Sequence, residues 1–159
     1  MSMFCFQCQE TAKGTGCTIK GVCGKNEEVS NLQDMLMYVL RGVSVFSTAA
    51  REKGIENDEV NKFIFDGLFT TITNANFDKN VFINRIKKGI EIRSMMRQEA
   101  EKAGAKFSSL HDCATWVPKS EEEIYSKSYQ VGVLSTSNED VRSLRELLIY
   151  GIKGMAAYG

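Results

Sequence analysis

The sequence predicts an all-α protein, in which an antiparallel three-helix bundle is followed by the first helix of a duplicated second bundle. Four segments carry apolar residues at the spacing of one helix face. Glycine, asparagine and aspartate separate these segments, as is typical of helix ends. Four of the five cysteines lie within the first 23 residues and predict an N-terminal cysteine-rich, cluster-binding loop. We therefore expect a loop at 1–27, a three-helix bundle at 28–104, a connector at 105–138 and a final helix at 139–159.

Composition and charge exclude several classes of function. The 159 residues are 43% hydrophobic, enough for a real core, and 20 acidic residues balance 20 lysines and arginines. A net charge of zero offers no attraction to nucleic acid or to an anionic membrane. No apolar stretch approaches the roughly 20 residues of a membrane helix, and no signal peptide is visible. We expect a soluble, cytoplasmic protein that binds neither nucleic acid nor membrane.

The first helix is predicted from a long apolar stripe. Ser30 with Gln33 forms a possible capping box at its start, and Gly54 is a plausible stop. The residues of the stripe are Leu32, Met35, Leu36, Val39, Leu40, Val43 and Phe46. This spacing predicts one buried face.

Two more helices complete the predicted bundle. The second follows Asn57, a favourable N-cap residue, and continues until Asn74 and Asn76 interrupt the pattern. The third begins after Asp78 and ends at Gly104. Short turns between the three segments predict antiparallel packing.

The connector at 105–138 has little periodicity. It contains the only proline, Pro118, and Ser120 with Glu123 predicts a short helical turn. Alternating valines at 130–134 permit a short extended segment.

The final helix repeats the first. Residues 32–42 align without gaps with residues 144–154, so that Tyr38 matches Tyr150 and Gly42 matches Gly154. Asp34 and Glu146 also match, and we expect both to favour helix starts through the helix dipole. The predicted inner face comprises Val141, Leu144, Leu148, Ile152 and Met155. We expect this face to pack on the first bundle or, in a homo-oligomer, on a second chain.

The cysteines form a Cys-x2-Cys-x8-Cys-x5-Cys array made of Cys5, Cys8, Cys17 and Cys23. Thiolates are soft ligands that bind zinc, copper(I) and iron–sulfur clusters. Structural zinc sites commonly use two tight Cys-x2-Cys pairs, whereas this array has one tight pair and two wider gaps. The spacing favours a 4Fe-4S cluster, with zinc and a thioredoxin-type dithiol as alternatives.

Other residues are less informative. Lys13, Lys20 and Lys25 could offset the negative charge of a cluster, but we interpret them as ordinary solvated lysines. We predict that His111 and Cys113 are structural residues and not metal ligands. With a single histidine and no nucleophile triad, the sequence predicts no catalytic residues.

The motif FCFQCQETAKGTGC at 4–17, the motif FTTITNANFD at 69–78 and the segment 143–158 resemble the hybrid-cluster proteins. These are also called prismane proteins or hydroxylamine reductases. The resemblance implies a 4Fe-4S cluster on Cys5, Cys8, Cys17 and Cys23, and a first domain built from two three-helix bundles. It also implies that hydroxylamine or nitric oxide is reduced at a second, hybrid cluster held by later domains.

The resemblance therefore predicts an N-terminal portion with an electron-relay role, not catalytic by itself. Its expected partners are an electron-donor protein and the remaining catalytic domains of the parent oxidoreductase. The alternative is a structural metal-binding helical domain, in which zinc or an iron–sulfur cluster fastens the loop and no electron moves.

Overall fold

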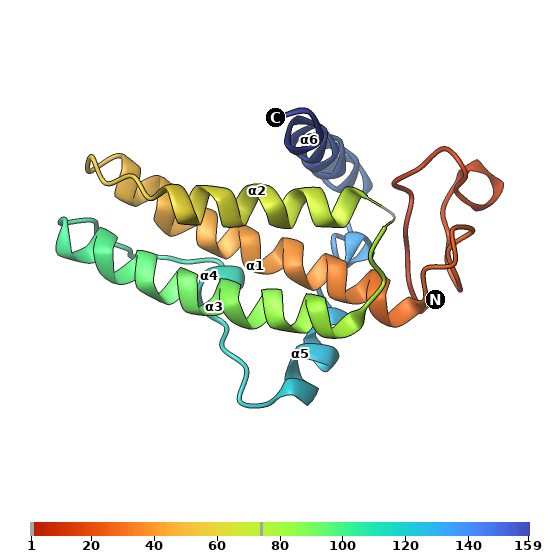
Figure 1. Ribbon diagram of the computed structural model, residues 1–159, viewed down its shortest axis with the longest axis horizontal. Coiled ribbons are helices and arrows are strands. Elements are labelled where there is room, and N and C mark those ends of the chain that lie inside the picture. The colour runs from red at the N-terminus through yellow and green to blue at the C-terminus, as the bar shows by residue number, and fades with distance from the viewer. Residues whose placement is uncertain (1, 74) are drawn as a thin grey trace.

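The computed structural model describes residues 2–73 and 75–159, and in these the fold is all-helical (Figure 1). Two short 3-10 turns lie at Ala12–Gly14 and Val133–Ser135. The α-helices are α1 (Glu27–Arg51), α2 (Asp58–Ile72), α3 (Lys79–Lys102), α4 (Asp112–Thr115), α5 (Glu121–Ser128) and α6 (Glu139–Tyr158). The predicted all-α class is confirmed. In the part of the chain described, no helix is both long and apolar enough to cross a membrane.

Helices α1, α2 and α3 form the bundle, and α1 contributes most of its core (Figure 1). The apolar stripe predicted for α1 is fully buried, which confirms the helix face read from the sequence. It packs mainly against Phe82, Ile83, Ile86 and Met96 of α3 and Val60 and Leu68 of α2. Burial of each large apolar side chain contributes about 1.5–3 kcal/mol, so this core holds the molecule together.

Most predicted helix ends are confirmed. Asn57 accepts a hydrogen bond from the Val60 N–H at 3.1 Å, and Asp78 accepts one from the Asn80 N–H at 2.9 Å. Gly54 follows α1 with a positive φ of 78°. The expected stop at Asn74 lies outside the described residues.

The predicted capping box at Ser30 and Gln33 is wrong, because α1 begins earlier. The Asn26 side chain accepts a hydrogen bond from the Val29 N–H at 2.9 Å, which caps the helix. Ser30 and Gln33 are consequently buried inside the first turns of α1. The extra turn of helix brings this end of α1 beside the cysteine loop (Figure 1).

The connector forms α4, which packs against α1, and α5, which lies on the side of the bundle away from α6 (Figure 1). Arg93 of α3 holds it by donating hydrogen bonds to the carbonyl oxygens of Cys113, at 2.6 Å, and Trp116. The extended segment expected at 130–134 is wrong. A turn closed by the Ser135 N–H and the Gly132 carbonyl, 2.9 Å apart, replaces it.

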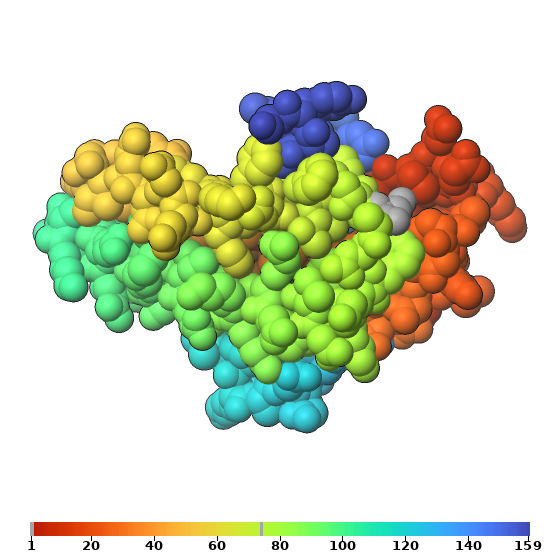
Figure 2. Space-filling view, in the orientation of Figure 1, coloured from red at the N-terminus to blue at the C-terminus, as the bar shows by residue number. Residues whose placement is uncertain are grey.

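Helix α6 lies at the predicted residues, but the face predicted to be buried is turned away from the bundle. It packs on α2 and projects from the bundle as a ridge in Figure 2. Its inward side carries Arg145, Glu146, Ile149, Lys153 and Ala156. The face expected to be buried is 39–75% exposed, at Val141, Leu144, Leu148, Ile152 and Met155. The expectation that this face packs on the first bundle is therefore wrong, because a charged face occupies that contact.

Candidate metal centre

The cysteine loop is folded back on itself by one antiparallel bridge. The Cys5 N–H donates to the Cys17 carbonyl at 3.0 Å, and the Cys17 N–H donates to the Cys5 carbonyl at 2.8 Å. Between them, the Thr11 N–H donates to the Cys8 carbonyl at 3.1 Å and starts the turn at Ala12–Gly14. The bridge makes the first and third cysteines of the array direct neighbours.

Cys17 lies in surroundings that favour a thiolate. Its Sγ accepts a hydrogen bond from the Ala12 N–H at 3.5 Å, and the side chain is buried. The pKa of the Cys17 thiol is lowered, first by the Ala12 N–H and then by the Val22 N–H, against the opposing effect of burial. Hydrogen bonds to sulfur stabilise its anionic form, which is the form that binds metals.

Cys23 lies on a second tight turn and is exposed to solvent. The Gly21 N–H donates to the Lys25 carbonyl at 2.7 Å, and the Gly24 N–H donates to the Gly21 carbonyl at 2.9 Å. Gly24 has a φ of 94°, which glycine adopts without strain. The turn thus presents the fourth cysteine of the array at the surface of the loop.

All five cysteines are free thiols. In the described residues, no three or more histidine, cysteine, aspartate or glutamate side chains are arranged to hold a metal ion. The structure thus brings Cys5 and Cys17 together and places Cys8 and Cys23 on two separate turns, and the four sulfur atoms do not converge. Four free cysteines, one of which has backbone N–H donors on its sulfur, are nevertheless a donor set that fits a soft metal centre.

Lys25 is the residue that the sequence interpretation missed. Lys13 and Lys20 are exposed as expected, but Lys25 is only 1% exposed. Its ammonium donates a hydrogen bond to Gln33 Oε1 at 2.7 Å and lies 3.8 Å from Cys5 Sγ. The only sequence signal is its place directly before the Asn26 cap, which fixes Lys25 where the loop meets α1.

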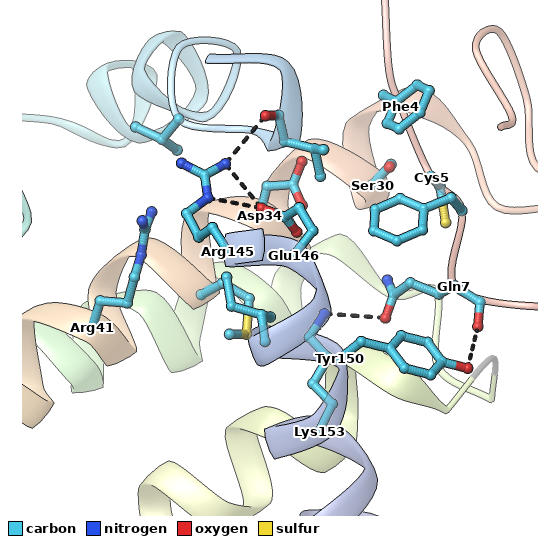
Figure 3. A pocket seen from close by; sticks show the side chains of 15 residues that line it. Phe4, Cys5, Gln7, Ser30, Asp34, Arg41, Arg145, Glu146, Tyr150 and Lys153 are labelled. Carbon is cyan, nitrogen blue, oxygen red and sulfur yellow. Dashed lines mark hydrogen bonds and ion pairs between the residues drawn. The ribbon is translucent and has the colours of Figure 1, made fainter. Parts of the chain in front are cut away.

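A polar cavity of about 40 Å³ lies between the loop, α1 and α6 (Figure 3). Two residues of α6 reach the loop there: the Tyr150 hydroxyl donates to the Gln7 carbonyl at 3.3 Å, and Lys153 donates to Gln7 Oε1 at 3.1 Å. Burial lowers the pKa of Lys153 to about 8. These contacts fasten the segment between Cys5 and Cys8 to the last helix.

Asp34 and Glu146 line the same cavity, so the expectation that they favour helix starts is wrong. Both lie well inside their helices. Burial raises the pKa of Asp34 to about 7, and Lys153 opposes that shift. Glu146 accepts a hydrogen bond from Arg145 at 2.9 Å. The repeated acidic positions therefore line one cavity from two different helices, α1 and α6.

His111 and Cys113 make structural contacts, as expected. The His111 Nδ1 accepts a hydrogen bond from the Cys113 N–H at 3.2 Å and caps α4. Cys113 is buried, and burial raises the pKa of its thiol. Neither residue lies in the cysteine loop or lines the polar cavity.

Comparisons with known proteins place this loop and these helices in one family. The model of the "Prismane/CO dehydrogenase family" matches residues 3–159. The chain is 60% identical over 159 residues to a hydroxylamine reductase of Desulfitobacterium hafniense (strain DSM 10664 / DCB-2), covering 99% of the chain and 29% of that protein. The hydroxylamine reductase of Thermoanaerobacter pseudethanolicus is 50% identical over 158 residues, with the same coverage.

A third relative is the hydroxylamine reductase of Parabacteroides distasonis, 54% identical over 156 residues, which are 98% of the chain and 28% of that protein. The chain thus spans less than a third of the length of the curated relatives it matches. The resemblance read from the cysteine array and the two helical segments is confirmed.

Proposed function

Because the chain belongs to the Prismane/CO dehydrogenase family, we propose that it binds a 4Fe-4S cluster and relays electrons within a hydroxylamine-reductase-type oxidoreductase. The proposed ligands are Cys5, Cys8, Cys17 and Cys23. The observation that supports this most directly is the buried Lys25 ammonium beside Cys5, 3.8 Å from its sulfur. A positive charge inside the fold calls for negative charge next to it, and thiolates bound to a metal supply that charge.

The residues of the chain would perform distinct tasks at this site. The four cysteines hold the cluster, which when bound can accept and release one electron at a time. The Ala12 N–H, 3.5 Å from Cys17 Sγ, stabilises negative charge on that sulfur. Phe4 and Phe6, whose ring centroids are 5.9 Å apart, place apolar surface beside the loop and limit access of water.

We place hydroxylamine reduction outside these residues. After four cysteines are assigned to the first cluster, His111 and Cys113 are the soft or imidazole donors left in the sequence, and both have structural contacts. A multi-iron catalytic site needs more ligands than these. The proposed partners are therefore an electron-donor protein and the catalytic parts of the longer relatives. The free cysteines are typical of a reducing compartment, which supports a cytoplasmic location.

A structural metal site is the second candidate. A single backbone bridge between Cys5 and Cys17 and a few side-chain contacts hold the loop, so zinc or a redox-silent cluster could fasten it. The exposed Cys23 fits either case, because it can approach a metal without disturbing the core.

The test is anaerobic reconstitution of the 159-residue chain with iron and sulfide. We expect iron and sulfide in equal amounts, about four of each per chain, and visible absorption that dithionite bleaches. Replacing any of the four loop cysteines by serine should reduce iron content sharply. Cys113→Ser is the matched control and should retain it. Colourless protein with one zinc per chain would exclude the electron-relay role. Iron loss in the Cys113→Ser control alone would exclude the loop cysteines as the ligands.

A further inference from the structure

Lys25 is buried, and its ammonium contacts both Gln33 and Cys5. We propose that Lys25 is a positioning residue for the cysteine site: Gln33 holds its ammonium against Cys5, and this fixed positive charge raises the reduction potential of the group on the cysteines. The inference rests on the proposed function, because it concerns the group that the cysteines would hold.

The position of the charge is fixed from both ends of the residue. The Lys25 carbonyl accepts a hydrogen bond from the Gly21 N–H at 2.7 Å. The ammonium donates to Gln33 Oε1 at 2.7 Å, and Gln33 is itself only 2% exposed. The ring centroid of Phe77 lies 6.0 Å from the ammonium and adds an aromatic face on one side. These contacts hold the ammonium inside the fold, away from solvent.

Among the described residues, no acidic side chain forms an ion pair with Lys25. Its hydrogen-bond partners are the neutral amide of Gln33 and the sulfur of Cys5. The other ionisable groups that sense its charge are Cys17, Asp34 and Lys153. Cys5 is therefore the ionisable group that this cation contacts directly in the described part of the chain.

Electrostatics gives the direction of the effect. Reduction adds one negative charge to a thiolate-bound cluster, and a nearby buried cation makes that addition more favourable. The Nε2 of Gln33 is a second buried polar group beside Lys25, and it has no hydrogen-bond partner in the described part of the chain. Water cannot screen either group at this depth, so the effect exceeds that of a surface lysine.

Redox titration of the reconstituted chain tests the proposal. In Lys25→Met we expect the ratio of reduced to oxidised cluster at a fixed potential to fall about tenfold, which is about 59 mV for one electron. Lys25→Arg should keep the wild-type value, because it retains the charge. Lys20→Gln removes an exposed lysine of the same loop and should change nothing. Equal potentials in wild type and Lys25→Met, with equal iron content, would overturn the proposal.

A second variant covers the case in which Lys25→Met fails to fold. Gln33→Glu is nearly isosteric and places a negative charge 2.7 Å from the ammonium, so it neutralises the local field and should also lower the potential. An unchanged potential in folded, loaded Gln33→Glu would count against the role of Lys25.

Uptake of iron and sulfide separates this inference from the proposed function. If wild-type protein takes up neither, the proposed function fails, and the role of Lys25 fails with it. If wild-type protein and Lys25→Met take up equal amounts and have equal potentials, the proposed function stands and only the role of Lys25 is overturned.

Discussion

Gly42 of α1 lies directly against the backbone of Cys113. A Cβ built on Gly42 would overlap the Cys113 carbonyl oxygen and lie 2.8 Å from the carbonyl carbon. The carbonyl cannot retreat freely, because Arg93 donates a hydrogen bond to it at 2.6 Å. The equivalent glycine of the internal repeat, Gly154 in α6, has no atom within 4 Å of such a Cβ. Both copies of the repeat thus have glycine at this place, but a neighbouring backbone excludes a side chain only at Gly42.

Gly42→Ala should destabilise the chain, whereas Gly154→Ala should not. The added methyl at position 42 forces the connector away from α1, and overpacking of this kind costs about 1–3 kcal/mol or more. At position 154 alanine replaces a helical glycine in open space and should stabilise α6 by up to about 1 kcal/mol. Urea unfolding followed by circular dichroism measures both values. Equal stabilities of the two variants would contradict the contact.

Arg93→Met should cost about 2–4 kcal/mol, because it leaves one buried and one partly buried carbonyl group without their charged donor. Arg97→Met is the matched control on the same helix. Arg97 forms an exposed ion pair with Glu101 four residues on, and such pairs contribute only about 0.3–0.5 kcal/mol. The same unfolding experiment compares them, and a similar loss in both variants would show that the Arg93 contacts add little.

Asp34 should make the stability of the chain fall as the pH rises from about 4 to 7. The pKa of Asp34 is raised to about 7 by burial, from an ordinary value of 3.8, so the folded state binds its proton more tightly than the unfolded state. Between these values unfolding releases a proton, and a higher pH favours unfolding. The unfolding free energy should fall by up to about 4 kcal/mol over this range, since one pKa unit corresponds to about 1.4 kcal/mol.

Asp34→Asn should flatten this pH dependence and give a more stable protein at pH 8 than wild type. Lys153 acts in the next window: its pKa, lowered to about 8, predicts that stability recovers as the pH rises from 8 toward 10.5. Unfolding free energies measured in urea from pH 4.5 to 10 report both effects. Parallel curves for wild type and Asp34→Asn would show that Asp34 is not the group responsible.

The exposed face of α6 should cause self-association of the isolated chain. Leu144, Leu148 and Met155 are 65–75% exposed on one helix, and a contiguous apolar surface of this kind seeks burial. Sedimentation velocity at micromolar concentration should show dimers or larger species. Leu148→Gln should shift them to monomer, whereas Lys62→Gln, on the exposed side of α2, should not. A monomer in the wild-type protein would leave this face to another partner.

Much of the helical fold could be predicted from the sequence, because the signals are local. The stripe of α1, the caps at Asn57 and Asp78 and the stop at Gly54 each depend on residues within a turn or two. The start of α1 was missed because Asn26 and Ser30 are both good cap residues, and tertiary contacts of the loop with α1 favour the earlier one.

The errors at α6 and Lys25 have a different origin. Periodicity finds the apolar face of α6, but burial of that face needs a neighbouring apolar surface. Here the neighbours on α1 and the loop are Asp34 and Gln7, which match Lys153 instead. Lys25 looks like a loop lysine in sequence, and only its contacts with Gln33 and Cys5 show that the loop folds over it. Both cases depend on contacts between residues far apart in the sequence, which a local sequence pattern does not show.

The contacts of Gln7 with α6 have a consequence for biosynthesis. Tyr150 and Lys153 are separated from Gln7 by 143 and 146 positions in the chain, yet they hold the segment between the first two cysteines. During translation the cysteines leave the ribosome well before the helix that fastens them. The thiols must therefore stay reduced, or already be occupied, until α6 has also been made.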